Sequence, residues 1–219
     1  MPEGAPPPVY AYVFVHQFEP VQGLQGDQTQ IGELLRRFRA AKVYRNDYEG
    51  SEGTWIGVRW AQQIVGSSVV FGAVTAPSLE VLQSWIAKEF WDAGVRSRWH
   101  VKDKDSRYRA PHHHSPPYYA YVRVRTRGNP RSVLRALDAM MDDKILPLIE
   151  LHGRDNEQGE GGWRDVFDYR AATVSGSGFD ILVELAAHSI EELTATIFDH
   201  LAPTPGVEST DTSFSYVEE

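Results

Sequence analysis

The spacing of apolar residues in the first half of the chain predicts four strands and two helices. A period of two predicts strands over Val9 to Gln17, Trp55 to Val65, Val69 to Thr75 and Val95 to Val101. A period near 3.6 predicts one helix after Asp27 and a second helix capped by Ser78. The first half therefore reads strand, helix, strand, strand, helix, strand.

The second half of the chain repeats this order of elements. Strands are predicted over Tyr118 to Thr126, Trp163 to Val174, Phe179 to Ala186 and Val207 to Val217. One helix follows Asn129 and Pro130, because proline is favoured at a first helical position. Another helix begins after Ser189, which can form a capping box with Glu192.

Several short segments of the first half recur in the second half, in the same order. VYAYVFV matches YYAYVRV, EGTW matches EGGW, and APSLEVLQSWI matches AHSIEELTATI. Strands rich in Tyr and Val resemble one another by composition alone, but composition does not explain the matching Trp positions. We therefore expect an internal duplication, with a flexible N-terminus (1–8), a first copy (9–101), a linker (102–117) and a second copy (118–219).

A strand, helix, strand, strand, helix, strand order is that of a ferredoxin-like unit, an antiparallel sheet with both helices on one face. The expected fold class is α+β, with two tandem ferredoxin-like βαββαβ units. The first strand of each copy carries aromatic and aliphatic residues on both faces, so the face away from the helices also requires a cover. We expect the two sheets to pair as a pseudo-dimeric α/β barrel, within one chain or between chains.

Charge and composition exclude several classes of function. A formal net charge of −8 gives no overall positive field for a phosphate backbone, so direct nucleic-acid binding is not expected. The absence of Cys excludes disulfides and thiolate chemistry and suits a cytoplasmic protein. The sequence has neither a signal peptide nor a long apolar run, so we expect no association with a membrane.

Four motifs of the second copy occur in an order typical of one known family. They are AYVRV (Ala120 to Val124), SGSGFDILVEL (Ser175 to Leu185), SIEEL (Ser189 to Leu193) and PGVESTDT (Pro205 to Thr212). The second copy resembles the effector-binding (RAM) domain of Lrp/AsnC transcriptional regulators, in the dimeric α/β-barrel superfamily. Two features differ from that family: the first strand begins near Val9 without room for a helix-turn-helix, and an insertion spans Lys144 to Trp163.

The resemblance implies a ligand site at the hairpin of the second copy. The family binds amino-acid effectors near this position, so Gly176, Ser177, Gly178 and Asp180 are candidate ligand-binding residues. An Asp at such a position can also simply stabilise the turn, and that alternative stays open.

Two further pairs complete the candidate ligand-binding set. Thr210 and Thr212 lie on the last predicted strand, where they could line a pocket, although alternating Thr also suits an edge strand. Trp55 and Trp163 recur after Glu-Gly in both copies and could form pocket walls, although a repeated Trp is commonly a core residue.

No motif indicates a metal site or a catalytic residue. His112, His113 and His114 would point to alternate sides of an extended chain, so we interpret them as linker. The sequence contains no HExxH pair, no phosphate-binding loop and no Gly-x-Ser-x-Gly elbow. We therefore expect no cofactor, and a binding protein rather than an enzyme.

The leading hypothesis is a ligand-sensing and oligomerisation module in transcription regulation, without its own DNA-binding domain. It would bind a small amino-acid-like metabolite, and it would form homo-oligomers or pair with a full-length regulator. The first alternative is an enzyme of the same fold, either a cofactor-free monooxygenase or a haem-binding protein, with His16, Trp99 and His100 as candidate residues. The second alternative is a structural scaffold that binds a partner protein.

Overall fold

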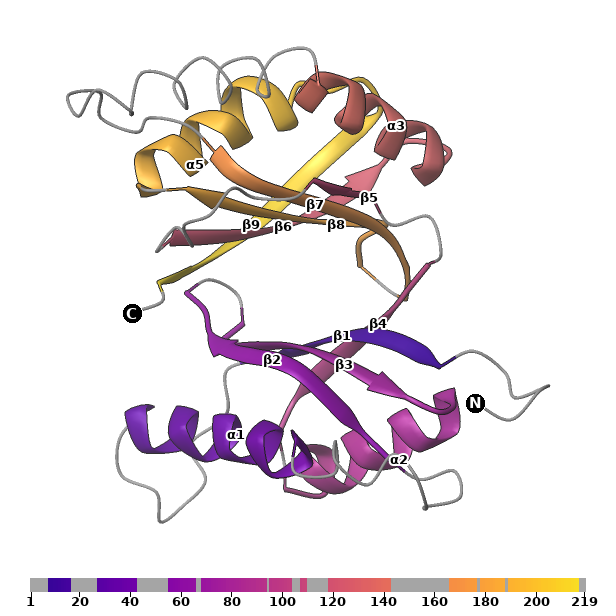
Figure 1. Cartoon of the computed structure of the whole chain (residues 1–219), viewed down its shortest axis with the longest axis vertical. Helices are drawn as coiled ribbons and strands as arrows, with labels where there is room; N and C mark the ends of the chain where they lie inside the picture. Colours follow the sequence, from indigo (N-terminus) through magenta and orange to yellow (C-terminus); the bar gives the residue numbers. More distant parts are fainter. Residues whose placement is uncertain are drawn as a thin grey trace. The chain divides into compact units, whose positions relative to one another are not determined.

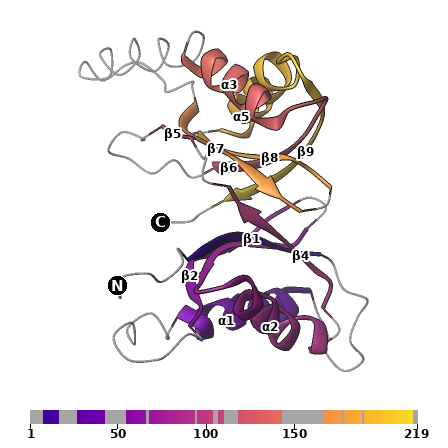
Figure 2. The ribbon, with the colours of Figure 1, turned by 90° about the vertical axis from the view of Figure 1, so that its right-hand side faces the viewer.

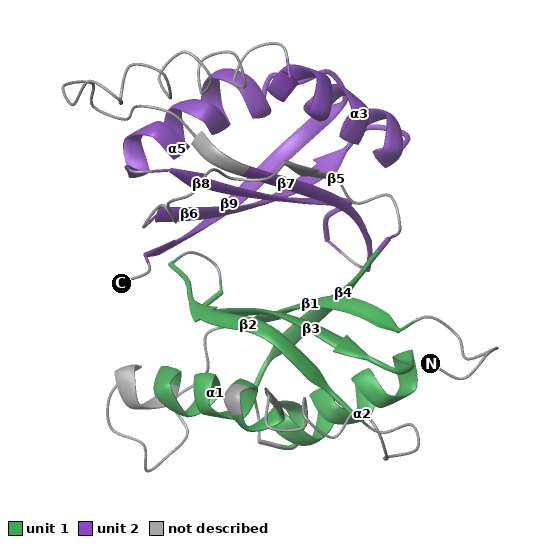
Figure 3. Cartoon of the chain, viewed as in Figure 1, with its two compact units in different colours: residues 1–102 green, residues 103–219 purple. Residues whose placement is uncertain are grey.

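The computed structural model describes residues 8–16, 27–42, 55–65, 68–93, 95–103, 107–109, 118–142, 166–176, 178–187 and 189–216. The chain divides into two compact units, residues 1–102 and 103–219, which Figure 3 distinguishes by colour. Each unit has its own antiparallel sheet, its own helices and its own hydrophobic core. The protein therefore has an α+β fold.

Unit 1 follows the order predicted for the first half of the chain. Its strands are β1 (Val9–Val15), β2 (Gly57–Gln63), β3 (Val70–Ala76) and β4 (Ser97–Lys102), which lie in the order β2-β3-β1-β4. Its helices are α1 (Asp27–Lys42) and α2 (Leu79–Glu89), and a short 3-10 helix, η2 (Trp91–Ala93), follows α2. Figures 1 and 2 show α1 and α2 against the same face of this sheet.

The core of unit 1 lies between this sheet and its helices. Alternate residues of β1, namely Ala11, Val13 and Val15, face the helices and are buried there. The ring of Phe38 on α1 contacts the rings of Trp85 and Phe90, with centroids 5.7 and 5.2 Å away.

Phe38 also lies directly over the backbone of β3. A Cβ atom at Gly72 would come within 2.7 Å of the Phe38 ring, so only glycine leaves room for the ring at this point. Ser78 caps α2, because its hydroxyl accepts a hydrogen bond from the Val81 amide at 3.3 Å, as the sequence predicts.

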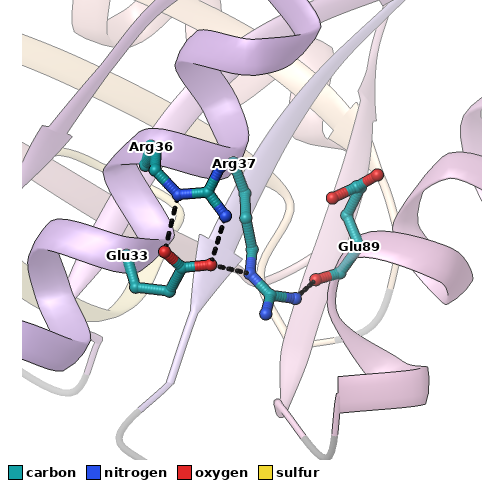
Figure 4. Close-up of polar contacts among 4 residues, drawn as sticks. All are labelled: Glu33, Arg36, Arg37 and Glu89. Carbon is teal, nitrogen blue, oxygen red and sulfur yellow. Dashed lines mark hydrogen bonds and ion pairs between the residues drawn. The ribbon is translucent and has the colours of Figure 1, made fainter.

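Charged residues tie α1 to the end of α2 at the surface of unit 1. The Glu33 carboxylate accepts hydrogen bonds from Nε and Nη2 of Arg36, both at 2.7 Å, and from Nε of Arg37 at 3.2 Å. Arg37 in turn donates to the backbone carbonyl of Glu89, as Figure 4 shows. The hydrogen bond from Arg36 is the main reason why the pKa of Glu33 is lowered from its ordinary value near 4.5.

Glu33→Gln should reduce the stability of unit 1 only where Glu33 is ionised. A carboxyl group whose pKa is lowered by folding contributes stability above its unfolded pKa, and this contribution is lost as the pH falls through the folded pKa. The side chain is about one-third exposed, so we expect a loss of roughly 0.3–1 kcal/mol near pH 7 that disappears in acid. Urea unfolding of both proteins between pH 3 and pH 7 measures this, and a pH-independent difference would contradict it.

Unit 2 also forms an antiparallel sheet with its helices on one face, as Figures 1 and 2 show. Its strands are β5 (Arg107–Arg109), β6 (Tyr118–Thr126), β7 (Val166–Ser175), β8 (Ile181–Ala187) and β9 (Val207–Tyr216). They lie in the order β7-β8-β6-β9, and β5 pairs with β7. The helices are α3 (Pro130–Met140) and α5 (Ile190–Thr196), and α5 continues into a π-helix, η5 (Ile197–Leu201).

The helices of unit 2 begin with the proline and the capping box that the sequence predicts, and Asn129 is an additional cap. Asn129 accepts a hydrogen bond from the Arg131 amide at 3.0 Å, and Pro130 occupies the first turn of α3. Ser189 and Glu192 form the reciprocal capping box of α5. The buried residues between these helices and the sheet include Val122, Val133, Leu134, Leu137, Val183, Leu193 and Ile197.

Asp103, the first residue of unit 2, is bonded to the body of that unit. Its amide donates to the carbonyl of Thr173 on β7 at 2.9 Å, and its carboxylate accepts from the Thr173 hydroxyl at 3.3 Å. Arg131 on α3 contacts the same carboxylate at 3.4 Å. These contacts fix the beginning of unit 2 against both its sheet and its first helix.

β5 is the element that the sequence did not reveal. It lies within residues 102–117, which we expected to be a linker, and it pairs with β7 through the register Tyr108 opposite Arg170. A strand of three residues is too short to show a period of two, so periodicity could not detect it. None of the described helices is long and apolar enough to cross a membrane.

Candidate functional site

An aromatic surface covers the side of the unit 1 sheet that faces away from the helices. It consists of Tyr12, Phe14, Trp60, Phe71 and His100, which we call the aromatic face. These side chains share one face because Tyr12 pairs with His100, and Phe14 with Phe71, at directly opposite positions of neighbouring strands.

Ring stacking holds the aromatic face together. Phe71 lies at its centre, stacked on Phe14 with centroids 4.2 Å apart and on Tyr12 at 5.8 Å, while Trp60 meets it edge-on at 4.8 Å. The imidazole of His100 lies edge-on to Phe14 at 6.0 Å and is only 2% exposed. Phe14 and Phe71 are buried as well, at 1% and 0% exposed, so the aromatic face is a packed cluster of rings beside one basic nitrogen.

The other two residues of the enzyme hypothesis lie apart from His100. Trp99, its neighbour on β4, packs against the core on the helix side, since successive strand residues face opposite ways. His16 follows β1, and its Nδ1 atom lies 3.2 Å from the hydroxyl of the buried Ser68. Of the three candidates, only His100 belongs to the aromatic face.

The corresponding face of unit 2 is polar instead of aromatic. Arg170, Glu184, Tyr121 and Ser213 lie opposite one another across β7, β8, β6 and β9. Arg123 and Asp211 pair in the next row. We call these six residues the polar face.

Arg123 is the most unusual residue of the polar face. Its Nη2 atom lies 3.0 Å from the Asp211 carboxylate and donates to the Ser213 hydroxyl at 3.2 Å. Its side chain is 9% exposed, whereas that of Asp211 is 58% exposed. The sequence does not single out Arg123, because arginines that alternate along a strand are typical of a solvated face. A comparison with Phe14, the matching position of the repeat, could have singled it out.

The turn between β7 and β8 contains four of the eight ligand-binding residues expected from the sequence. Asp180 accepts hydrogen bonds from the amide and the hydroxyl of Thr126, at 2.8 and 3.0 Å, and its own amide donates to the Val124 carbonyl. Gly176 and Gly178 are exposed, and Gly178 has a φ of 110°. These contacts agree with the alternative stated above, that Asp180 stabilises the turn. They hold the turn against the end of β6.

The other expected site residues lie on different elements or outside the described residues. Thr210 and Thr212 lie on β9, opposite Val124 and Val122, and are partly exposed. Trp55 belongs to unit 1 and lies near Gly57. Ser177, Trp163 and the run His112 to His114 fall outside the described residues. Within the described ranges, no three His, Asp or Glu side chains cluster in a way that could hold a metal ion.

Comparisons with known proteins identify the fold. No family model matches the chain, and no curated protein sequence matches it. A putative monooxygenase from Lactobacillus acidophilus NCFM superposes with a TM-score of 0.51 at 8% identity, covering 95% of this chain and 92% of its own. A chlorite dismutase double mutant from Candidatus Nitrospira defluvii superposes with a TM-score of 0.54 at 10% identity, covering 96% and 92%. At these identities the likeness shows the fold alone, an α+β fold with an antiparallel sheet.

These comparisons correct three expectations from the sequence. The resemblance to Lrp/AsnC effector domains is wrong, because the matching structures are of the chlorite dismutase and monooxygenase kind. The assignment to transcription regulation is wrong for the same reason. The amino-acid effector, with its pairing to a full-length regulator, is likewise wrong.

The motifs misled because they encode local backbone geometry. SGSGFD forms the β7–β8 turn, SIEEL forms the capping box of α5, and PGV places Gly206 at a φ of 90° before β9. Turns, helix caps and left-handed glycines of this kind occur in many folds. The motif match to the Lrp/AsnC family therefore reflects local backbone geometry and does not identify a ligand.

Proposed function

We propose that this chain is a dimeric α/β-barrel protein that binds a flat, haem-type ligand on the aromatic face of unit 1. The main support for this proposal is the buried imidazole of His100, which lies next to the stacked rings of Phe14 and Phe71. The fold shared with chlorite dismutase and a putative monooxygenase supports this proposal. It replaces the sensing module as the leading function.

The same proposal covers the arrangement of the chain. We propose that the two units are tandem ferredoxin-like copies that together form a pseudo-dimeric barrel, with the duplication boundary between residues 101 and 118. The matching order of elements in both units supports this. We place the protein in the cytoplasm, which its lack of Cys favours.

The residues of the aromatic face suit a haem. His100 would provide a nitrogen ligand to the iron, and Phe14, Trp60 and Phe71 would contact the porphyrin. Arg98 is exposed on the same face of β4, where a guanidinium can pair with a propionate. A bound haem would supply an iron centre for redox chemistry, while the protein residues would fix its orientation and limit access of water.

His100→Ala should remove the axial ligand and the spectroscopic signature that depends on it. The protein is titrated with hemin, and the Soret and visible bands are followed for the wild type and the variant. We expect a His-ligated spectrum in the wild type and its loss in His100→Ala. Added imidazole should restore the spectrum, because it can replace the missing ligand at an otherwise intact site.

His200→Ala is the matched control, since His200 lies on η5 of unit 2 and is not a member of the aromatic face. It should leave the spectrum unchanged. A wild-type protein that shows no hemin-dependent Soret shift would overturn the proposal. An unaltered spectrum in His100→Ala would overturn the role of His100 as axial ligand.

A further inference from the structure

The two units carry different chemistry at the same positions of the same fold. In unit 1, Gln62, Phe71, Phe14 and Arg98 lie opposite one another across β2, β3, β1 and β4. In unit 2, the matching row across β7, β8, β6 and β9 is Ala172, Leu182, Arg123 and Asp211. Arg123 therefore occupies the position that Phe14 fills in unit 1.

The row beside it shows the same change. Trp60, Ala73, Tyr12 and His100 in unit 1 correspond to Arg170, Glu184, Tyr121 and Ser213 in unit 2. The Arg170 and Glu184 side chains approach to 3.9 Å, with Glu184 only 14% exposed. Unit 1 carries Trp60 and Phe14 at the positions of Arg170 and Arg123, so the same strand arrangement forms there without these charges.

A buried arginine is a costly residue to keep on a sheet face. Removing a guanidinium from water is unfavourable, and a single ion pair often fails to compensate for the loss of hydration. Replacing both members of a buried ion pair by apolar side chains is commonly neutral or stabilising. The guanidinium of Arg123 is therefore better explained by a role in binding than by a role in stability.

The Arg123–Asp211 pair has one buried member and one exposed member. Asp211 lies on β9, which is the last strand of the order β7-β8-β6-β9, and its carboxylate reaches solvent. A carboxylate at the rim is readily exchanged for another anion of the same geometry. The hydroxyl of Ser213, which is fully buried, lies at the same guanidinium nitrogen and can contribute to the site.

We propose that the polar face of unit 2 binds a small oxyanion or carboxylate, which displaces Asp211 and pairs with the guanidinium of Arg123. The planar guanidinium matches two oxygen atoms of such a group. Asp211 is the internal competitor that keeps the arginine paired in the absence of ligand. All residues of this site belong to unit 2, and none of them is a proposed haem-binding residue.

The test measures anion binding by calorimetry and thermal shift at constant ionic strength, without added hemin. The probes are nitrite, formate and acetate, and acetamide serves as the uncharged control. Arg123→Gln should weaken binding by about tenfold or more, the range of a charge-assisted hydrogen bond. Asp211→Asn should tighten it about three- to fivefold, because a partly exposed competing ion pair has been removed.

Arg125→Gln provides the matched control. Arg125 lies on the same strand two residues further on, is exposed, and donates to the Gly178 carbonyl at 3.2 Å. Its substitution should leave anion affinity unchanged. Equal loss in Arg125→Gln and Arg123→Gln would show a nonspecific charge effect and would overturn the site.

The Asp211 variant decides the question if Arg123→Gln fails to fold. Asp211 is exposed, so Asp211→Asn leaves the buried part of the face in place. Unchanged or weaker anion binding in this variant would overturn the proposal. The proposal would also be overturned if neither the wild type nor Asp211→Asn bound any of the anions. This conclusion does not depend on the outcome of the hemin titration.

Discussion

Phe38→Ala is expected to destabilise unit 1 by about 3–5 kcal/mol, the usual range for a fully buried Phe replaced by Ala. The Phe38 ring is 0% exposed and contacts the rings of Trp85 and Phe90, so its removal leaves a cavity between α1 and the sheet. Chemical denaturation followed by circular dichroism measures the loss. Leu35→Ala, on the same helix but only partly buried, should cost less.

Gly72 allows a sharper version of this experiment. In the wild type, Gly72→Ala would force a Cβ to within 2.7 Å of the Phe38 ring and should be destabilising by about 1–3 kcal/mol. In the Phe38→Ala background the same methyl group enters the space that the ring left. The double variant should therefore be more stable than the sum of the single changes predicts. Simple additivity would show that Phe38 does not pack over Gly72.

Gly206→Ala should destabilise unit 2 by about 2–4 kcal/mol, through backbone strain and a steric clash together. Gly206 has a φ of 90°, in the left-handed region that L-residues avoid. A Cβ there would also lie 2.6 Å from Cγ2 of Val133 on α3. The unfolding midpoint of the variant measures the combined effect.

Gly128→Ala separates the two causes. Gly128 has nearly the same φ, 92°, but a Cβ there would meet nothing within 4 Å. It should lose only about 1–2 kcal/mol, the cost of the left-handed backbone. Val133→Ala combined with Gly206→Ala should recover part of the loss, because it removes the clashing methyl group. Equal losses at both glycines would exclude the clash.

The order of secondary structure could be predicted from the sequence because it depends on local signals. The strand Tyr118 to Thr126 matches β6 at both ends, and Ser78, Asn129 and Ser189 each cap the helix assigned to them. Helix caps and periodic apolar residues act within a few positions of the chain, so one sequence suffices to find them.

The candidate sites could not be predicted in this way because they depend on strand register. Phe14 and His100 are far apart in the sequence and become neighbours only through the pairing of β1 with β4. Arg123 and Asp211 meet through the pairing of β6 with β9. A strand sequence with apolar residues on both faces does not show which face will be buried. It also does not show which side chain of the neighbouring strand will lie opposite a given residue.

The contacts of Asp103 determine where unit 2 can be separated from the rest of the chain. A fragment that starts at Tyr118 would omit both Asp103 and β5, and it would leave the hydroxyl of Thr173 and one edge of β7 without these partners. A fragment that starts at Asp103 or a few residues earlier keeps them. A fragment of unit 2 made for anion-binding measurements should therefore begin before Asp103, at a residue of β4.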